Sequence, residues 1–182
     1  MIPLYLDPAK VRIALIGRGP LAVRRLRWLR DGGAEPDVWS DQPGADLVAE
    51  AGSSLQSGIP DDLMRYRAIW IADLPAEISD ALAENARKAG VLINVEDVVA
   101  QCDFHTPAVV RRGKLTLTAG TGGASPAVAR AAREQLEAAF PTDWAQALNE
   151  IADARAALRA RGASFDALVD DARVRLTAHG LI

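Results

Sequence analysis

VRIALIGRGPLA, residues 11–22, sets the architecture of this chain. Its first six residues form an apolar run between charged residues and glycine, which is typical of a buried strand. Gly17 and Gly19 then lead into a helical stretch that continues to Arg30, before a glycine pair that can end it. Residues 36–40 have the character of a second strand. This region therefore predicts a strand–turn–helix–strand unit.

The same alternation continues outward from this unit. Residues 44–58 are mixed and weakly helical, and residues 66–72 form another apolar run. Residues 75–89 have apolar side chains at helical spacing, and residues 90–95 again suit a buried strand. Strands that alternate with helices indicate a mostly parallel sheet covered on both faces. We therefore expect an α/β, Rossmann-like parallel-sheet domain over residues 1–98.

The pattern changes after residue 98. Residues 104–111 and 114–119 are two strand candidates joined through Arg112-Gly113, which favours a β-hairpin. Ser125-Pro126 opens a strong helix, with serine as the N-cap and proline at the first helical position. The remainder is helical, with a break at Arg161-Gly162. We expect a hairpin and helix segment over residues 99–140 and a small helical part over residues 141–182.

Composition excludes several classes of protein. The 182 residues are 49% apolar and 25% charged, which is typical of a folded chain of one ordinary domain or one with a small appendage. No apolar run approaches the roughly 20 residues of a membrane helix, and the first residues do not resemble a secretion signal. A net charge of −3 and a pI near 5.4 disfavour a general nucleic-acid binder. We therefore expect no membrane partner and no nucleic-acid partner.

The chain has too few cysteine and histidine residues to form a metal-binding site from them. Cys102 is the one cysteine, so a disulfide framework and a cysteine-based metal site within one chain are excluded. His105 and His179 are the two histidines, and neither has a second ligand at a metal-binding spacing. We expect no protein metal site, and a reducing cytoplasm is the natural compartment.

Basic residues gather in two groups. They are either solvated faces or surfaces for phosphates or a polycarboxylate ligand. The first group is Lys10, Arg12, Arg18, Arg24, Arg25, Arg27 and Arg30, and the second is Arg111, Arg112, Lys114, Arg130 and Arg133.

The glycine-rich turn is a candidate dinucleotide site. Gly17 and Gly19 fit the G-x-G-x-x-A spacing between a strand and a helix, where backbone amides can approach a pyrophosphate. Asp41 follows about 20 residues later, where a carboxylate can hold a ribose diol. Pro20 removes one amide donor, and Arg18 could obstruct a phosphate or pair with it. The alternative is a tight turn with no ligand.

Two further stretches could carry chemistry. Asn94-Val95-Glu96-Asp97 ends a strand at the carboxyl edge of the sheet, where Asp97 could act as a general base; a solvated strand end is the alternative. Residues 121–126, TGGASP, could receive a carboxylate on amides and hydroxyls at a helix N-terminus. The alternative there is an N-cap and nothing more.

The order of these motifs resembles the precorrin-2 dehydrogenase/sirohydrochlorin ferrochelatase family, the N-terminal module of siroheme synthases. The glycine-rich start is followed by NVED (94–97), CDFHTPA (102–108), RRGKLTLT (111–118) and TGGASPAVARAAREQLE (121–137). The resemblance covers almost the whole chain, and residues 94–137 are its most specific part.

The resemblance implies an enzyme of siroheme biosynthesis. Family members are homodimers that oxidise precorrin-2 to sirohydrochlorin with NAD, and many then insert ferrous iron as a second substrate. Their central segment dimerises. Asp97 falls on the catalytic aspartate of the family, and Asn94, Thr121 and Ser125 fall on its tetrapyrrole-binding pattern; Arg111 and Arg130 suit the carboxylates of the substrate. The implied cofactor positions are Gly17, Gly19, Pro20, Leu21, Asp41 and Gln42, and Asp41 favours NAD because a carboxylate repels a 2′-phosphate.

Two departures touch the cofactor site. Gly17-Arg18-Gly19 stands where relatives usually have three glycines, and Leu74 and Pro75 replace polar residues after the third predicted strand. Two alternatives therefore stay open. One is a tetrapyrrole metal chelatase or tetrapyrrole-binding protein that has lost NAD use. The other is a non-enzymatic regulatory module that senses a dinucleotide.

Overall fold

The first of two compact units contains a five-stranded parallel sheet. The structure, a computed structural model, describes residues 1–182, and these divide into Met1–His105 and Thr106–Ile182. The strand order is β3-β2-β1-β4-β5, with every neighbouring pair parallel. This confirms the predicted α/β, Rossmann-like class. The strands are β1 Ile13–Gly17, β2 Asp37–Ser40, β3 Leu55–Ser57, β4 Ala68–Ala72 and β5 Leu92–Val95.

Helices cover both faces of this sheet. They are α1 Pro20–Asp31, α2 Ala45–Ala51 and α3 Ala76–Lys88. Side chains alternate along β1, so that Ile13 and Leu15 pack in the core under α1 and α2, whereas Ala14 and Ile16 pack in the core under α3. Because β1 is central and buried on both faces, its sequence is a continuous apolar run.

β3 is the one strand of this sheet that the sequence did not predict. Residues 44–58 read as weakly helical, but only α2 and the short 3-10 turn Gly52–Ser54 are helical there. β3 has three residues, LQS, and pairs with β2 at the edge of the sheet. An edge strand with one apolar residue lacks the pattern that identifies buried strands.

The second unit begins with the predicted hairpin. β6 Ala108–Arg112 and β7 Leu115–Ala119 are antiparallel, and the turn between them is Gly113-Lys114. Gly113 has a φ of +60°, which glycine adopts without strain. The turn therefore falls one residue later than the predicted Arg112-Gly113.

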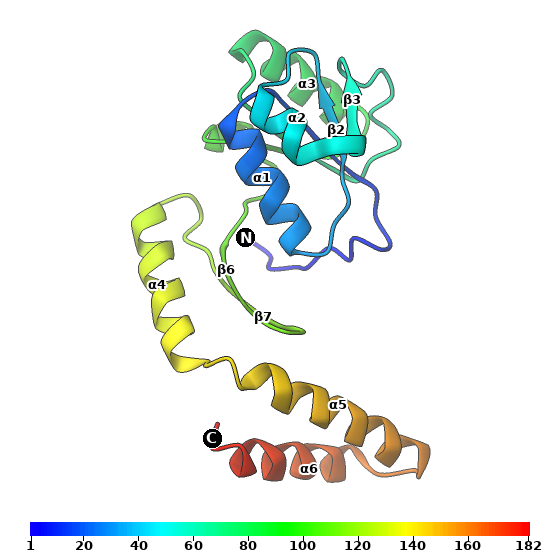
Figure 1. The fold of residues 1–182 in the computed structure, drawn as a ribbon, viewed down its shortest axis with the longest axis vertical. Coiled ribbons are helices and arrows are strands. Elements are labelled where there is room, and N and C mark those ends of the chain that lie inside the picture. The colour runs from blue at the N-terminus through cyan, green and yellow to red at the C-terminus, as the bar shows by residue number, and fades with distance from the viewer. The chain divides into compact units, whose positions relative to one another are not determined.

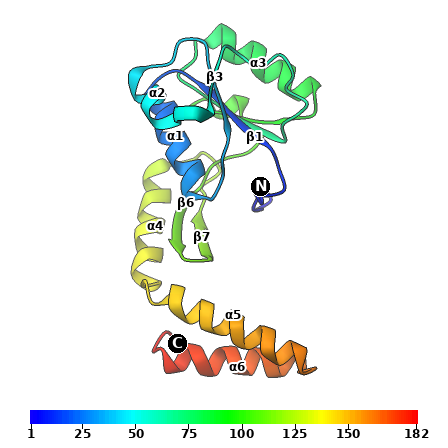
Figure 2. The ribbon, with the colours of Figure 1, turned by 45° about the vertical axis from the view of Figure 1, so that its right-hand side comes forward.

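Three helices follow the hairpin. α4 Pro126–Ala139 packs on β6 and β7, and α5 Trp144–Ala160 lies beside α6 Phe165–Ala178 (Figures 1 and 2). Ser125 caps α4, since its Oγ accepts a hydrogen bond from the Val128 amide at 3.3 Å. None of the helices is long and apolar enough to cross a membrane.

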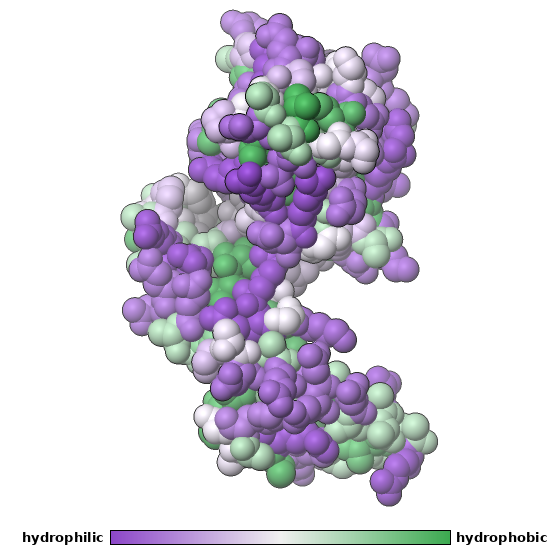
Figure 3. Space-filling model, viewed as in Figure 1, coloured by the Kyte–Doolittle hydropathy of each residue, from purple (hydrophilic) through white to green (hydrophobic).

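The second unit has very little core of its own. Its buried hydrophobic residues are Val110, Ala147 and Leu168, and α4 contains no buried residue. Hydrophobic surface is visible between α4 and the hairpin in the space-filling view (Figure 3). A unit with so few buried residues leaves apolar surface available for a partner.

Candidate functional site

The loops at the carboxyl edge of the sheet carry most of the predicted site residues of the first unit. Parallel pairing aligns Gly17 with Ala72 and Ile71 with Val95, so the loops after β1, β4 and β5 emerge at one edge. The loop after β2 emerges beside them. From β1 the chain first adds β2 and β3 on one side and then β4 and β5 on the other. The strand order therefore reverses between β1 and β4, and in open α/β sheets ligands bind at the carboxyl ends of the strands beside such a reversal.

Gly17 is required by close packing. A Cβ at this position would lie 2.5 Å from the Ala72 carbonyl oxygen and 2.8 Å from the Ala22 Cβ. These neighbours belong to β4 and α1, so neither can move without separating the strand or the helix. The first glycine of the motif therefore holds β1, β4 and α1 together.

The N-terminus of α1 is capped by a residue from the loop after β4. Asp73 Oδ2 accepts hydrogen bonds from the Leu21 amide at 2.7 Å and the Ala22 amide at 3.0 Å. Pro20 has no N–H, and the Val23 amide already donates to the Gly19 carbonyl at 3.2 Å. The amides of Leu21, Ala22 and Val23 thus all have protein partners.

Arg18 and Asp41 form a bidentate salt bridge. Arg18 Nε donates to Asp41 Oδ1 at 2.8 Å and Nη2 donates to Oδ2 at 2.6 Å. These hydrogen bonds lower the pKa of the Asp41 carboxyl and raise the pKa of the Arg18 guanidinium. The Gly44 amide also donates to the Arg18 carbonyl at 2.8 Å. The carboxylate predicted to hold a ribose is therefore engaged by arginine, while Gln42 beside it is exposed.

Glu96 ties the end of β5 to α1. Its carboxylate is 7% exposed and lies 2.6 Å from Arg24 Nη2 and 2.5 Å from Arg25 Nη2. Burial acts to raise the pKa of Glu96, but the two guanidiniums outweigh it and hold the pKa below its ordinary value. Arg25 also stacks over the Trp28 ring at 5.0 Å. This triad fixes the turn that carries Asp97.

Asp97 is exposed and held in an unusual backbone conformation. Its φ is +63°, and its side chain forms no hydrogen bond or ion pair. Asp73, after the neighbouring strand β4, has a φ of +55°. These are the two non-glycine residues with positive φ, and such strain is concentrated at functional sites. The free carboxylate of Asp97 can accept a proton.

Asn94 is buried rather than open to a ligand. It is 5% exposed, and its Nδ2 donates to the Phe104 carbonyl at 2.9 Å and approaches Cys102 Sγ at 3.4 Å. Burial raises the pKa of the Cys102 thiol. Asn94 therefore fixes the segment that leads out of the sheet, and Phe104 in that segment packs edge-on against Trp70.

The second unit holds the remaining predicted residues. Thr121 Oγ1 donates to the Ser125 carbonyl and accepts from the Ser125 amide, each at 3.2 Å. This closes a loop in which Gly122 and Gly123 have positive φ. Arg111 lies on β6, and Arg130 on α4 pairs with Glu134 at 2.9 Å while 77% exposed. The structure thus brings Thr121 and Ser125 together, while Asp97 belongs to the other unit.

Many predicted basic residues have structural partners. Arg112 does not face a ligand, because its Nε donates to the Phe140 carbonyl at 2.6 Å at the end of α4. Arg133 pairs with Glu137. In the first group, arginines form ion pairs within the first unit. These are Arg12 with Asp37, Arg18 with Asp41, Arg24 and Arg25 with Glu96, Arg27 with Glu50, and Arg30 with Glu35 and Glu50.

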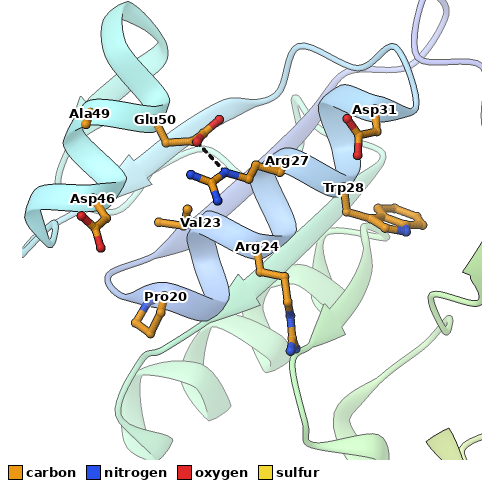
Figure 4. Close-up of a pocket in the computed structure, with 9 residues that line it drawn as sticks. All are labelled: Pro20, Val23, Arg24, Arg27, Trp28, Asp31, Asp46, Ala49 and Glu50. Carbon is orange, nitrogen blue, oxygen red and sulfur yellow. Dashed lines mark hydrogen bonds and ion pairs between the residues drawn. The ribbon is translucent and has the colours of Figure 1, made fainter. Parts of the chain in front are cut away.

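Two hollows lie in the first unit. A cavity of about 170 Å³ lies at the ends of β4 and β5, and its lining combines apolar residues with the polar residues Asp73, Ser79, Asp80, Glu96 and Gln101. A shallower groove of about 590 Å³ runs between α1 and α2, crossed by the Arg27–Glu50 pair (Figure 4). Its arginines are already paired, Arg27 with Glu50 and Arg24 with Glu96, so the smaller cavity at the strand ends is the better candidate. No group of three or more His, Cys, Asp or Glu side chains is placed to hold a metal ion.

Sequence reasoning missed Asp73 and the structural role of Glu96. Asp73 and Glu96 both contact residues of α1 that are distant in the sequence, so no local sequence pattern predicts these contacts. The one available signal was the acidic residue that directly follows the buried strands β4 and β5.

Comparisons with known proteins agree with this architecture. Residues 4–108 match the family described as "Putative NAD(P)-binding". The siroheme synthase of Methylococcus capsulatus is 31% identical over 163 residues, which cover 87% of this chain and 34% of that protein. The siroheme synthase of Xylella fastidiosa is 30% identical over 174 residues, covering 92% of this chain and 36% of that protein. The chain therefore spans about a third of the length of these relatives.

A solved structure has the same fold. SirC, described as a precorrin-2 dehydrogenase, superposes with a TM-score of 0.68 at 19% sequence identity, and the match covers 100% of both chains. The family match spans more than half of this chain, and both relatives align with most of its length at about 30% identity. The chain belongs to the family described as putative NAD(P)-binding, and siroheme synthases are among its relatives.

Proposed function

We propose that this chain oxidises precorrin-2 to sirohydrochlorin with NAD in siroheme biosynthesis. The observation that carries the proposal is Asp97. It presents a free carboxylate in strained backbone at the carboxyl end of a parallel strand. Siroheme synthases are among the relatives of the chain, and the resemblance of the NVED motif implies that Asp97 is the catalytic aspartate.

Asp97 is the general base in this proposal. NAD, when bound, supplies the acceptor for the hydride that leaves the macrocycle. Oxidation also releases a proton, which an exposed carboxylate can accept. Glu96 and Asn94 position this base, because Glu96 holds the turn to α1 and Asn94 holds the following segment through the Phe104 carbonyl.

The second unit supplies substrate contacts in this proposal. Precorrin-2 is rich in carboxylates, and the loop between Thr121 and Ser125 presents hydroxyls and glycine amides at the start of α4. Arg111 and Arg130 supply positive charge. Arg130 is free to exchange partners, because its pair with Glu134 is an exposed i,i+4 pair of little energetic value.

Residues 99–140 form a dimerisation segment, and residues 141–182 a small helical domain, in this proposal. The hairpin and α4 together bury one hydrophobic residue, Val110, so a second copy of the chain would cover the apolar surface they expose. The reducing cytoplasm is the proposed compartment. Light scattering at micromolar concentration tests the dimer, and a monomer would contradict it.

An anaerobic absorbance assay tests the activity. Precorrin-2 is incubated with the protein, with and without NAD, and the appearance of sirohydrochlorin is followed. We expect NAD-dependent oxidation that falls by roughly 10²–10⁴ in Asp97→Asn. Asp62→Asn, an exposed aspartate in a loop of the same unit, is the matched control and should retain full rate. Full activity in Asp97→Asn would refute its role.

Metal insertion without NAD is a second candidate function. It is favoured by one observation, which is that Asp73 and Arg18 already engage the amides and carboxylate expected to bind the dinucleotide. Ferrous iron would then be a substrate that enters preformed sirohydrochlorin, with Asp97 accepting a pyrrole proton. Accelerated insertion of ferrous or cobaltous ion in a protein that performs no oxidation would favour this candidate.

A further inference from the structure

The pyrophosphate position of the dinucleotide fold already contains a carboxylate. Asp73 Oδ2 accepts hydrogen bonds from the Leu21 amide at 2.7 Å and from the Ala22 amide at 3.0 Å. These two amides are donors that the N-terminus of α1 would offer to a phosphate. Pro20 supplies no donor and the Val23 amide is used within the helix. A phosphate that approaches this helix therefore finds the amides of Leu21, Ala22 and Val23 already engaged.

The surrounding residues are shaped to this carboxylate. A Cβ on Gly19 would lie 3.0 Å from Asp73 Oδ2, so the second glycine of the motif makes room for the aspartate. Asp73 forms no ion pair, and Arg18, the nearest arginine of the motif, is committed to Asp41 at 2.6 Å. A pyrophosphate beside Asp73 would meet an uncompensated like charge.

The backbone of Asp73 favours its release. Its φ of +55° is unfavourable for a residue with a Cβ, and the two hydrogen bonds to α1 accompany this conformation. The loop can relax when another anion takes the amides. The two hydrogen bonds to α1 thus favour the position of the Asp73 carboxylate, whereas the backbone conformation of Asp73 favours its release.

We propose that Asp73 is an internal competitor for the dinucleotide pyrophosphate and sets the affinity of the chain for its cofactor. This inference rests on the proposed use of NAD. Binding requires the Asp73 carboxylate to leave the Leu21 and Ala22 amides before the pyrophosphate can accept them. The chain therefore binds NAD more weakly than its α1 helix would allow without this side chain.

Two variants separate occupancy from charge. Asp73→Gly removes the carboxylate and suits the positive φ, whereas Asp73→Asn keeps an acceptor for the amides but removes the charge. Asp62→Gly is the matched control, because Asp62 is an exposed loop aspartate that also accepts a backbone hydrogen bond, from Met64 at 2.9 Å. Dissociation constants for inorganic pyrophosphate and for NAD are measured by calorimetry on the full chain.

We expect Asp73→Gly to bind both probes at least about tenfold more tightly than the wild type, which corresponds to the roughly 1.4 kcal/mol of one decade in affinity and to the scale of a helix cap. The affinity of Asp73→Asn for each probe should lie between that of the wild type and that of Asp73→Gly. The affinity of Asp62→Gly should match that of the wild type. Equal pyrophosphate affinity in the wild type and both Asp73 variants would overturn the proposal. If Asp73→Gly does not fold, Asp73→Asn alone decides.

The two probes also distinguish this inference from the proposed function. Tighter pyrophosphate binding in the Asp73 variants, without NAD binding by any form, would support the competitor and refute NAD use. NAD binding of equal strength in all forms would refute the competitor and support NAD use.

Discussion

Replacing Glu96 with glutamine should destabilise the first unit far more than the same change at the surface. The Glu96 carboxylate is 7% exposed and accepts from two guanidiniums, and Arg25 opposite it is 10% exposed. Removing one partner of a buried ion pair costs about 3–5 kcal/mol, because the other charge stays buried. Glutamine keeps one acceptor oxygen, and the Trp28 ring at 5.0 Å still faces Arg25. We therefore expect a loss of about 2–3 kcal/mol in the free energy of unfolding.

Urea denaturation followed by tryptophan fluorescence measures this loss. Trp28, Trp39 and Trp70 all belong to the first unit, so the signal reports mainly on its unfolding. With the m-value of a small domain, the midpoint should fall by roughly 1–2 M urea. The control is Glu84→Gln, which breaks an exposed pair with Lys88 on α3 and should leave the midpoint unchanged. Equal midpoints for both variants would refute the argument that this triad anchors the end of β5.

Three further predictions concern packing, pH and capping. Gly17→Ala should cost about 2 kcal/mol or more in unfolding experiments, because its Cβ would clash with the Ala72 carbonyl at 2.5 Å; Gly120→Ala, which meets open space, should cost little. The pKa of Glu96 in the folded chain lies below its ordinary value. The contribution of Glu96 to the free energy of unfolding is therefore complete above about pH 4.5 and is lost as the pH falls through the pKa of the folded state. The stability difference between wild type and Glu96→Gln should therefore shrink in acid and stay constant at neutral pH; a difference that grows in acid would contradict this sign. Ser125→Ala should destabilise α4 by about 1 kcal/mol, measured by circular dichroism, and an unchanged melting curve would show that the Val128 amide needs no cap.

The sequence predicted the architecture of the first unit well because its strands are buried on both faces. β1 and β4 are continuous apolar runs that end at glycine or alanine, and α1 begins at Pro20 directly after the glycine turn. β3 was missed because pairing at the edge of a sheet needs backbone contact with β2 rather than an apolar pattern.

The candidate site was only partly predictable. Local patterns located the turn at Gly17 and the strand end at Asp97, and the structure places both at the carboxyl edge of the sheet. The partners of Arg18 and Leu21 could not be predicted in this way, since they lie in the loops after β2 and β4. Basic residues such as Arg112 appeared free in the sequence for the same reason, because their acceptors come from distant residues.

The central place of β1 has a consequence for how the chain folds. Gly17 pairs with Ala72, roughly fifty residues later, and the register of β1 with β4 cannot form until that later strand has been synthesised. The hairpin of β6 and β7 and the pair of α5 and α6 depend on neighbours in sequence instead. Contacts between distant residues close slowly and local ones quickly, so we expect Thr106–Ile182 to reach its native contacts faster than Met1–His105, although it is synthesised after that unit.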